Sequence, residues 1–214
     1  MYAQAVKSVS VPTQSILFNI DIEGPLTKDK TAVLRVFAKM FYNHCGFYGD
    51  DLKIAKLERF IEKQGKTQQF REAFEKVNGA PWTETRDSFA FFEDDIVSVL
   101  QSTLGMSEQA ARNWFNGEET NELSIAQLVA DIQEYVDGKG KDFRLLFMVD
   151  EVGQYIGDDG DLMINLQSLV EEIGIRCHGK VWVMVTSQEA IDSVVHITRS
   201  EERRVGKECR SRWS

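Results

Sequence analysis

Three short runs of this sequence are apolar at nearly every position, and they restrict the fold more than any other feature. They are residues 16–20 (ILFNI), 145–149 (LLFMV) and 181–185 (VWVMV). Continuous apolar runs of this length are typical of strands covered on both faces, as in a parallel sheet between helices. The runs therefore predict an α/β fold with at least three strands in a parallel sheet.

Each of the three runs is followed by polar or acidic residues. Asp21 follows the first run, Asp150 and Glu151 follow the second, and Thr186 and Ser187 follow the third. The carboxyl ends of parallel strands meet at one edge of a sheet, and α/β proteins bind their ligands there. We therefore expect these polar residues to share one edge.

The segment between the first two runs has the periodicity of helices. Apolar residues recur every three or four positions, with glycines or acidic residues at the expected boundaries. Helices are predicted over residues 31–45, 51–64, 67–77, 87–104, 107–115, 124–136, 162–173 and 188–195. Ser124 and Gln127 fit a capping box. This order of elements indicates a sheet layer with a large all-helical insertion at about residues 50–138.

Composition limits the class of protein. With 43% hydrophobic and 28% charged residues, the chain resembles soluble globular proteins. No apolar run approaches the ~18 residues that cross a bilayer, and three scattered cysteines fit a reducing compartment. We therefore expect a cytoplasmic protein. The formal charge of -9 argues against a surface that coats nucleic acid, because phosphates require clustered Lys and Arg.

The last stretch, residues 199–214 (RSEERRVGKECRSRWS), is basic and has no apolar period. Its first six residues are what the codons AGA TCG GAA GAG CGT CGT of a common sequencing adapter encode. We therefore expect this stretch to be a non-native addition rather than a basic nucleic-acid arm, and exclude it from the fold.

The second run and its acidic end, LLFMVDE, have the pattern of a Walker B strand. Asp150 at the strand end can hold Mg²⁺ beside nucleotide phosphates, directly or through water. Glu151 can orient and polarise an attacking water. A buried strand that ends in solvated acids has the same pattern. The hydroxyl groups of Thr186 and Ser187, one strand later, favour nucleotide chemistry because a polar tip there can sense the γ-phosphate.

No phosphate-binding loop of the form G-x-x-x-x-G-K-[ST] occurs in the sequence. Residues 65–67 (GKT) end like one, but Phe60 stands where its first glycine belongs, and a turn between two helices is expected there. The His-Cys pairs at residues 44–45 and 177–178 lack the ligand spacing of a zinc site.

Four segments of the sequence, taken together, resemble the large P-loop ATPase of the BREX phage-exclusion system, the BrxC/PglY family. The resemblance covers about residues 15–195 and rests on SILFNID, FNGEETN, LLFMVDEVGQYIGDDGDLMINLQSLVEEIG and VWVMVTSQEAIDSV. It implies that residues 1–198 are a partial P-loop NTPase domain whose phosphate-binding loop lies upstream of this sequence.

The resemblance also implies roles for individual residues. Asp150 matches the family's Mg²⁺-binding aspartate and Glu151 its catalytic glutamate. Thr186 and Ser187 match a sensor-like string, and Gln154 has a supporting place in DEVGQ. The full-length protein would use ATP and Mg²⁺, while this segment alone would be inactive. The implied partners are other BREX proteins and, indirectly, phage or host DNA, and the full-length protein could form a homo-oligomer.

A non-catalytic helical interaction or assembly module is the alternative. Its basis is the acidic helical segment at about residues 50–138, in which Trp82 and Trp114 stand near loops or helix ends. Core packing explains both tryptophans equally well. A strand followed by a GxxxxGK[ST] loop upstream in the gene would favour the ATPase, and its absence from an intact gene would favour the module.

Overall fold

The computed structural model describes residues 11–25, 27–116 and 123–187, and its fold is α/β and mostly helical. One parallel sheet has the order β1-β2-β3, made of β1 (Thr13–Asn19), β2 (Arg144–Asp150) and β3 (Val181–Val185). The three predicted strands are confirmed, but Ile20 opens helix α2 (Ile20–Glu23) instead of closing β1. The Asn19 side chain caps this helix by accepting the N–H groups of Asp21 and Ile22.

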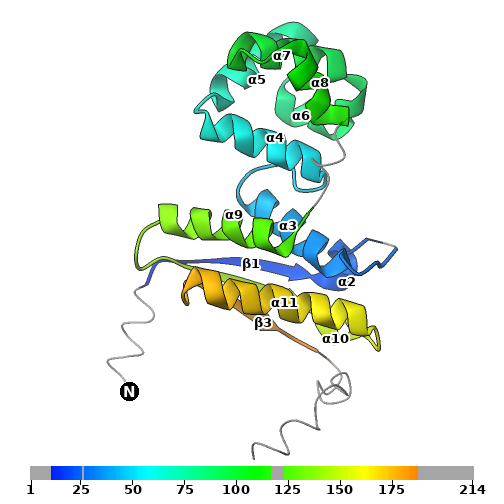
Figure 1. Cartoon of the computed structure of the whole chain (residues 1–214), viewed down its shortest axis with the longest axis vertical. Coiled ribbons are helices and arrows are strands. Elements are labelled where there is room, and N and C mark those ends of the chain that lie inside the picture. The colour runs from blue at the N-terminus through cyan, green and yellow to red at the C-terminus, as the bar shows by residue number, and fades with distance from the viewer. Residues whose placement is uncertain (1–10, 26, 117–122, 188–214) are drawn as a thin grey trace, which may run out of the picture.

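The described helices that pack on the sheet all lie on one of its faces. This face carries alternate residues of β1 and β2 that are 5% exposed or less: Ile16, Phe18, Leu145, Phe147 and Val149. Three helices pack over it, α3 (Ala32–His44), α9 (Ile125–Gly138) and α11 (Gly160–Cys177). Figure 1 shows α9 and α11 running along the strands, and α11 contacts α9, α3 and β3.

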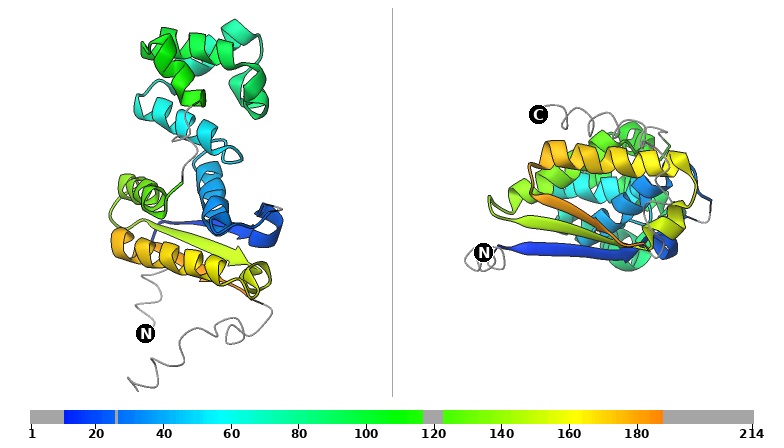
Figure 2. Two further views of the ribbon diagram at one scale, coloured as in Figure 1. Left: turned by 45° about the vertical axis from the view of Figure 1, so that its right-hand side comes forward. Right: turned by 90° about the horizontal axis from the view of Figure 1, so that it is seen from below.

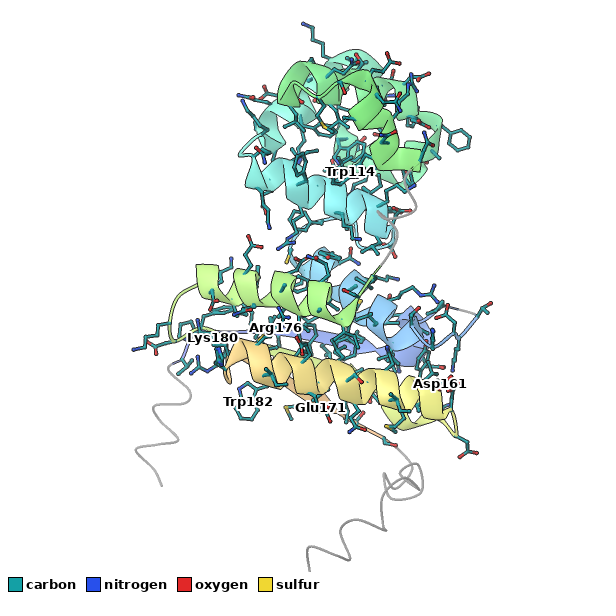
Figure 3. All side chains as sticks on the ribbon, in the orientation of Figure 1. Trp114, Asp161, Glu171, Arg176, Lys180 and Trp182 are labelled. Carbon is teal, nitrogen blue, oxygen red and sulfur yellow. The ribbon has the colours of Figure 1, made fainter. Side chains whose placement is uncertain are left out.

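The opposite face of the sheet is open in the part of the chain that the structure describes. Leu17 is 69% exposed, Trp182 60% and Met184 54%, and Figure 3 shows Trp182 projecting outward from β3. The prediction that both faces of these strands are buried is therefore wrong for the described residues. In the sheet order β1-β2-β3, each new strand is added on the same side of the one before it. Two crossover connections of the same handedness therefore place their helices on the same face of the sheet.

The remaining helices of the long connection form a separate lobe beyond α3 and α9 (Figures 1 and 2). They are α4 (Leu52–Lys63), α5 (Thr67–Asn78), α6 (Trp82–Thr85), the 3-10 helix η1 (Arg86–Phe91), α7 (Glu93–Leu104) and α8 (Glu108–Asn116). The lobe has its own core, in which the Trp82 ring packs edge-on against Phe70 and Phe74 with ring centroids 5.3 and 5.0 Å away. Figure 3 labels Trp114 of α8, whose ring lies 5.4 Å from that of Phe60 in α4.

Two predicted helices differ from the structure by more than two residues at one end. The helix predicted over residues 87–104 is divided into η1 and α7, because Phe92 between them has non-helical angles (φ -121°, ψ 24°). The helix predicted to end at Gly174 continues to Cys177, because Ile173 and Cys177 extend its buried stripe. A glycine inside a helix costs only about 1 kcal/mol, and this packing offsets it.

Helices α4 and α9 start at the capping residues that the sequence indicates. The Asp51 side chain accepts the N–H of Ile54, and Ser124 accepts the N–H of Gln127. The capping box is only half formed, because the Gln127 side chain donates to Asp131 instead of returning to Ser124.

A polar cluster joins the lobe to the helices over the sheet. Arg59 of α4 pairs with Asp131 and Glu134 of α9, and Lys63 also reaches Glu134 at 2.7 Å. Tyr42 of α3 donates to Asp131 at 2.7 Å, and burial followed by the Asp131 charge raises the pKa of this tyrosine. The two apolar cores are separate clusters, and the two regions meet through these paired charges and through Leu52 and Ala55 of α4, which pack with the core over the sheet.

Some predictions concern residues outside the described ranges. These are the helix at residues 188–195, the non-native stretch at 199–214 and most of the FNGEETN segment. Within the described ranges, no helix is both long enough and apolar enough to cross a membrane.

Candidate functional site at the carboxyl edge of the sheet

The carboxyl ends of the strands bring together most of the polar residues that the sequence predicts to share an edge. The pairing of β1 with β2 runs to Asn19 and Asp150, and that of β2 with β3 runs to Val149 and Val185. The residues that follow these positions therefore lie side by side at one end of the sheet.

Asp150 and Thr186 form the centre of this edge. The Thr186 hydroxyl donates to Oδ1 of Asp150, and the same oxygen accepts the N–H of Glu151 at 3.0 Å. Asp150 and Thr186 are exposed, and neither hydrogen bond uses Oδ2 of Asp150. One carboxylate oxygen is thus oriented by the protein, and these two hydrogen bonds leave the second, on an exposed residue, unused.

Glu151 has a left-handed backbone, with φ 63° and ψ 28°, which is uncommon for a residue other than glycine. Its N–H lies 3.3 Å from Oγ1 of Thr186, and the next N–H, that of Val152, donates to the Thr186 carbonyl at 3.1 Å. Strained backbone of this kind persists only where the surroundings fix it, and it clusters at functional sites. The tip of β3 supplies that fixation here.

Ser187 takes a different position from Thr186. Its Oγ is buried and has no hydrogen-bond partner among the described residues. It packs against Gly153 of helix α10 (Val152–Ile156), where a Cβ would lie 2.0 Å from it. Of the two hydroxyls predicted to be sensor-like, therefore, only that of Thr186 reaches Asp150.

Lys28 belongs to this edge, although the sequence does not single it out. Its Nζ donates to the Tyr155 carbonyl at 2.9 Å, lies 4.0 Å from the centre of the Tyr155 ring, and is 3.7 Å from Asp21. It therefore ties the loop between α2 and α3 to α10. No local pattern could have signalled this, because Tyr155 lies 127 residues further along the chain. Gln154 is exposed on α10, and its supporting role stays a prediction.

The donor set at this edge fits one protein ligand of a Mg²⁺ ion. Mg²⁺ keeps several waters and is bound by one or two carboxylates together with substrate phosphates, and Oδ2 of Asp150 meets that requirement. Residues 11–25, 27–116 and 123–187 contain no group of three or more His, Cys, Asp or Glu side chains that could hold a metal ion. A Mg²⁺ ion at Asp150 would therefore take most of its shell from water or from groups outside the described residues.

No turn in the described ranges has the form of a phosphate-binding loop. Residues 65–67, which end like one, form the helix–helix turn expected from the sequence. Gly65 has φ 65° and follows Gln64, the C-cap of α4, and Thr67 opens α5 directly after Lys66.

A cavity of about 720 Å³ lies beside α2 and α3 rather than over Asp150. Its basic side chains are already paired. Lys39 bridges Glu23 at 2.8 Å and Asp50 at 2.9 Å, and the hydrogen bond to Glu23 raises the pKa of Lys39. Arg35, which also lines the cavity, pairs with Asp29 at 2.6 Å. The cavity therefore offers little free positive charge to a phosphate.

No family model matches this chain, and no solved structure matches it. The assignment of the site therefore depends on its geometry. That geometry consists of an oriented carboxylate (Asp150), a second carboxylate on a left-handed turn (Glu151) and a hydroxyl (Thr186), together at the carboxyl edge of a parallel sheet.

Proposed function

We propose that this chain is the Walker B and sensor part of a P-loop ATPase of the BREX phage-exclusion type. One observation carries the proposal: Asp150 and the Glu151 backbone share the Thr186 hydroxyl at the carboxyl edge of the sheet. A strand that merely ended in solvated acids would need neither this hydroxyl nor a left-handed glutamate. The sequence resemblance supports the choice of family.

The proposal gives each residue a distinct task. Asp150 binds Mg²⁺ through the oxygen that Thr186 leaves unused, and Thr186 fixes the orientation of that carboxylate. Glu151 accepts a proton from the attacking water or holds it in line. ATP with Mg²⁺ supplies the transferred phosphoryl group and the neutralising charge. Of the two sensor-like residues, only Thr186 acts at this edge, through its hydrogen bonds with Asp150 and the Glu151 N–H, while Ser187 packs against Gly153.

The proposal also covers the rest of the fold. The three strands belong to a larger P-loop core, residues 50–138 are a helical insertion into it, and residues outside this sequence supply the phosphate-binding loop. The separate core of the lobe supports the idea of an insertion. The full-length protein works in the cytoplasm with other BREX proteins, can form homo-oligomers, and reaches phage or host DNA indirectly.

ATP hydrolysis by the protein of the complete reading frame, with Mg²⁺, tests this proposal. Glu151→Gln keeps the shape of the side chain but removes its basic carboxylate, so turnover should fall by about 1,000-fold while ATP still binds. Glu171→Gln is the matched control, because Glu171 lies on α11 (Figure 3) and only accepts a hydrogen bond from Gln167. Unchanged turnover in Glu151→Gln would remove Glu151 from catalysis.

The 214-residue chain itself offers a second test. It should show no measurable ATPase activity, because backbone amides of the missing loop provide the phosphate cradle. Titration with Mg²⁺ and ATP measures this directly, and tight binding would mean that the cradle lies within this chain. Reading the gene upstream should reveal a strand followed by GxxxxGK[ST].

One observation favours the second candidate, an interaction module. Phe91 of the lobe is 86% exposed, beside the acidic first turn of α7 (Glu93, Asp94 and Asp95). A partner with an apolar pocket rimmed by basic residues would suit this surface. Phe91→Ser should weaken capture of BREX proteins without changing ATP turnover, and a pull-down with purified components measures this.

A further inference from the structure

Gly153 and Ser187 meet in a contact that leaves no room for a side chain at position 153. A Cβ on Gly153 would lie 2.0 Å from Oγ and 3.0 Å from Cβ of Ser187. Both distances are shorter than the separation at which packed carbon atoms attract. The contact joins the first turn of α10 to the residue that follows Thr186.

The requirement for glycine here is steric rather than conformational. Gly153 lies within a helix and does not have a positive φ, so any L-residue could adopt its backbone. Only the Ser187 side chain excludes a larger residue. Gly174 of α11 provides the contrast, because nothing lies within 4 Å of a Cβ built there.

The contact is one of several links between α10 and the tip of β3. The Thr186 N–H donates to the Val149 carbonyl at 2.9 Å, and the Thr186 carbonyl accepts the Val152 N–H at 3.1 Å. The Thr186 hydroxyl bonds Asp150. The chain is thus fixed to β3 both before and after Glu151, and its left-handed turn cannot relax unless the two segments separate.

We propose that Gly153 is a positioning residue: the lack of a side chain lets Ser187 close against α10, and this closure sets the direction of the Glu151 carboxylate. The catalytic consequence rests on the proposed function of Glu151, whereas the contact does not. A methyl group at position 153 clashes with the Ser187 hydroxyl and lies 3.0 Å from its Cβ, so Ser187 and the tip of β3 must shift away from α10. A displacement of about 1 Å at a catalytic group can cost about 100-fold in turnover.

Thermal unfolding of the 214-residue chain tests the contact without ATP. Gly153→Ala should lower the melting temperature by about 5 °C through overpacking. Adding Ser187→Ala should restore part of this, because a Cβ remains 3.0 Å away, and adding Ser187→Gly should restore most, because the next atom is then 3.9 Å away. Gly174→Ala should not lower the melting temperature. The inferred contact would be wrong if Gly153→Ala melted at the wild-type temperature. It would also be wrong if Ser187→Ala and Ser187→Gly restored the melting temperature of Gly153→Ala equally.

Turnover of the complete protein, measured well below its melting temperature, tests the positioning role. Gly153→Ala should lower kcat about 100-fold with KM for ATP unchanged, and Gly153→Ala/Ser187→Gly should turn over at least about tenfold faster than the single variant. A merely structural glycine would change the amount of folded protein but not kcat per folded molecule.

The two proposals fail in distinguishable ways. Normal kcat in folded Gly153→Ala, together with an inactive Glu151→Gln, would overturn the positioning role and leave the proposed function standing. A wild-type protein without ATPase activity would overturn the proposed function and the catalytic part of this inference, while the melting series would still decide the contact.

Discussion

The open face of the sheet and the core of the helical lobe expose their large side chains to different extents. In the lobe, Trp82 is 2% exposed and closes a core of aromatic rings, whereas Trp182 of the sheet is 60% exposed. The polar residues with a proposed chemical role all lie on the sheet layer. The comparison teaches that the lobe closes its core with its own residues, while the layer with the candidate chemistry leaves one face of its sheet open to further contacts.

Two glutamates, one in each region, give the largest expected effects. Glu151→Gln should lower turnover by about 1,000-fold with little change in stability. Glu58 of the lobe is buried and accepts hydrogen bonds from Trp82 at 2.7 Å, Arg86 at 3.0 Å and the Tyr48 N–H at 2.6 Å. Glu58→Gln should lower the free energy of unfolding by about 2 kcal/mol and leave kcat unchanged. Turnover and denaturant unfolding should be measured on both variants, and a shared phenotype would break the comparison.

Two tryptophans sharpen the same contrast. Trp82→Ala should lower the free energy of unfolding by about 3–5 kcal/mol, because it leaves a large cavity between Phe70 and Phe74. Trp182→Ala should change it by less than about 0.5 kcal/mol, because the ring is mostly exposed. Urea unfolding measures both values.

Hydrogen exchange of Trp82→Ala shows where the stability is lost. Amides of α5 and α7 should exchange faster, while those of β2 keep their protection, because the lobe and the sheet layer have separate cores. Uniform loss of protection would mean that the two regions unfold as one cooperative unit.

The polar junction between the regions should have a smaller effect. Arg59→Met removes the cation that pairs with the buried Asp131, although Tyr42 and Gln127 still donate to that carboxylate. The free energy of unfolding should fall by about 2 kcal/mol. Arg112→Met is the control, because Arg112 pairs only with exposed or half-exposed acids and should not change stability measurably.

His44 should give the smallest effect, visible only through pH. Burial, and then the Lys139 charge, lowers the pKa of His44 in the folded protein. Because the folded state disfavours the protonated imidazole, protonation of His44 lowers the free energy of unfolding. The contribution of neutral His44 to the free energy of unfolding is therefore complete above about pH 6.5, and it decreases as the pH falls below that value. Between pH 7.5 and 5.5, the wild type should lose about 1 °C more melting temperature than His44→Gln. An equal loss in both proteins would contradict the burial of His44.

The secondary structure was largely predictable from the sequence, while the way the sheet is covered was not. Apolar periodicity reports that a side chain tends to be buried, and it placed α3, α4, α5 and α9 to within a few residues. It cannot report which neighbour does the burying. Leu17 and Trp182 belong to continuous apolar runs and still lie on the open face, because both crossovers pass over the other one.

The residues that meet at the candidate site were predictable from the sequence, but the orientation of Ser187 and the backbone conformation of Glu151 were not. Asp150, Glu151 and Thr186 follow parallel strands, and strand topology alone brings such positions to one edge. The orientation of Ser187 depends on Gly153, a glycine in another element that no local pattern connects with it. The left-handed turn at Glu151 was equally hidden, because nothing in a glutamate signals a positive φ.

The register of the sheet has a consequence for synthesis on the ribosome. Thr13 of β1 pairs with Arg144 of β2, so the first strand emerges long before its partner exists. At about 5–20 residues per second, this delay lasts on the order of ten seconds, enough for the lobe to fold first. During that interval Ile16, Leu17 and Phe18 form a bare apolar segment on the nascent chain. A cellular chaperone that holds this segment until β2 arrives would therefore raise the yield of native protein.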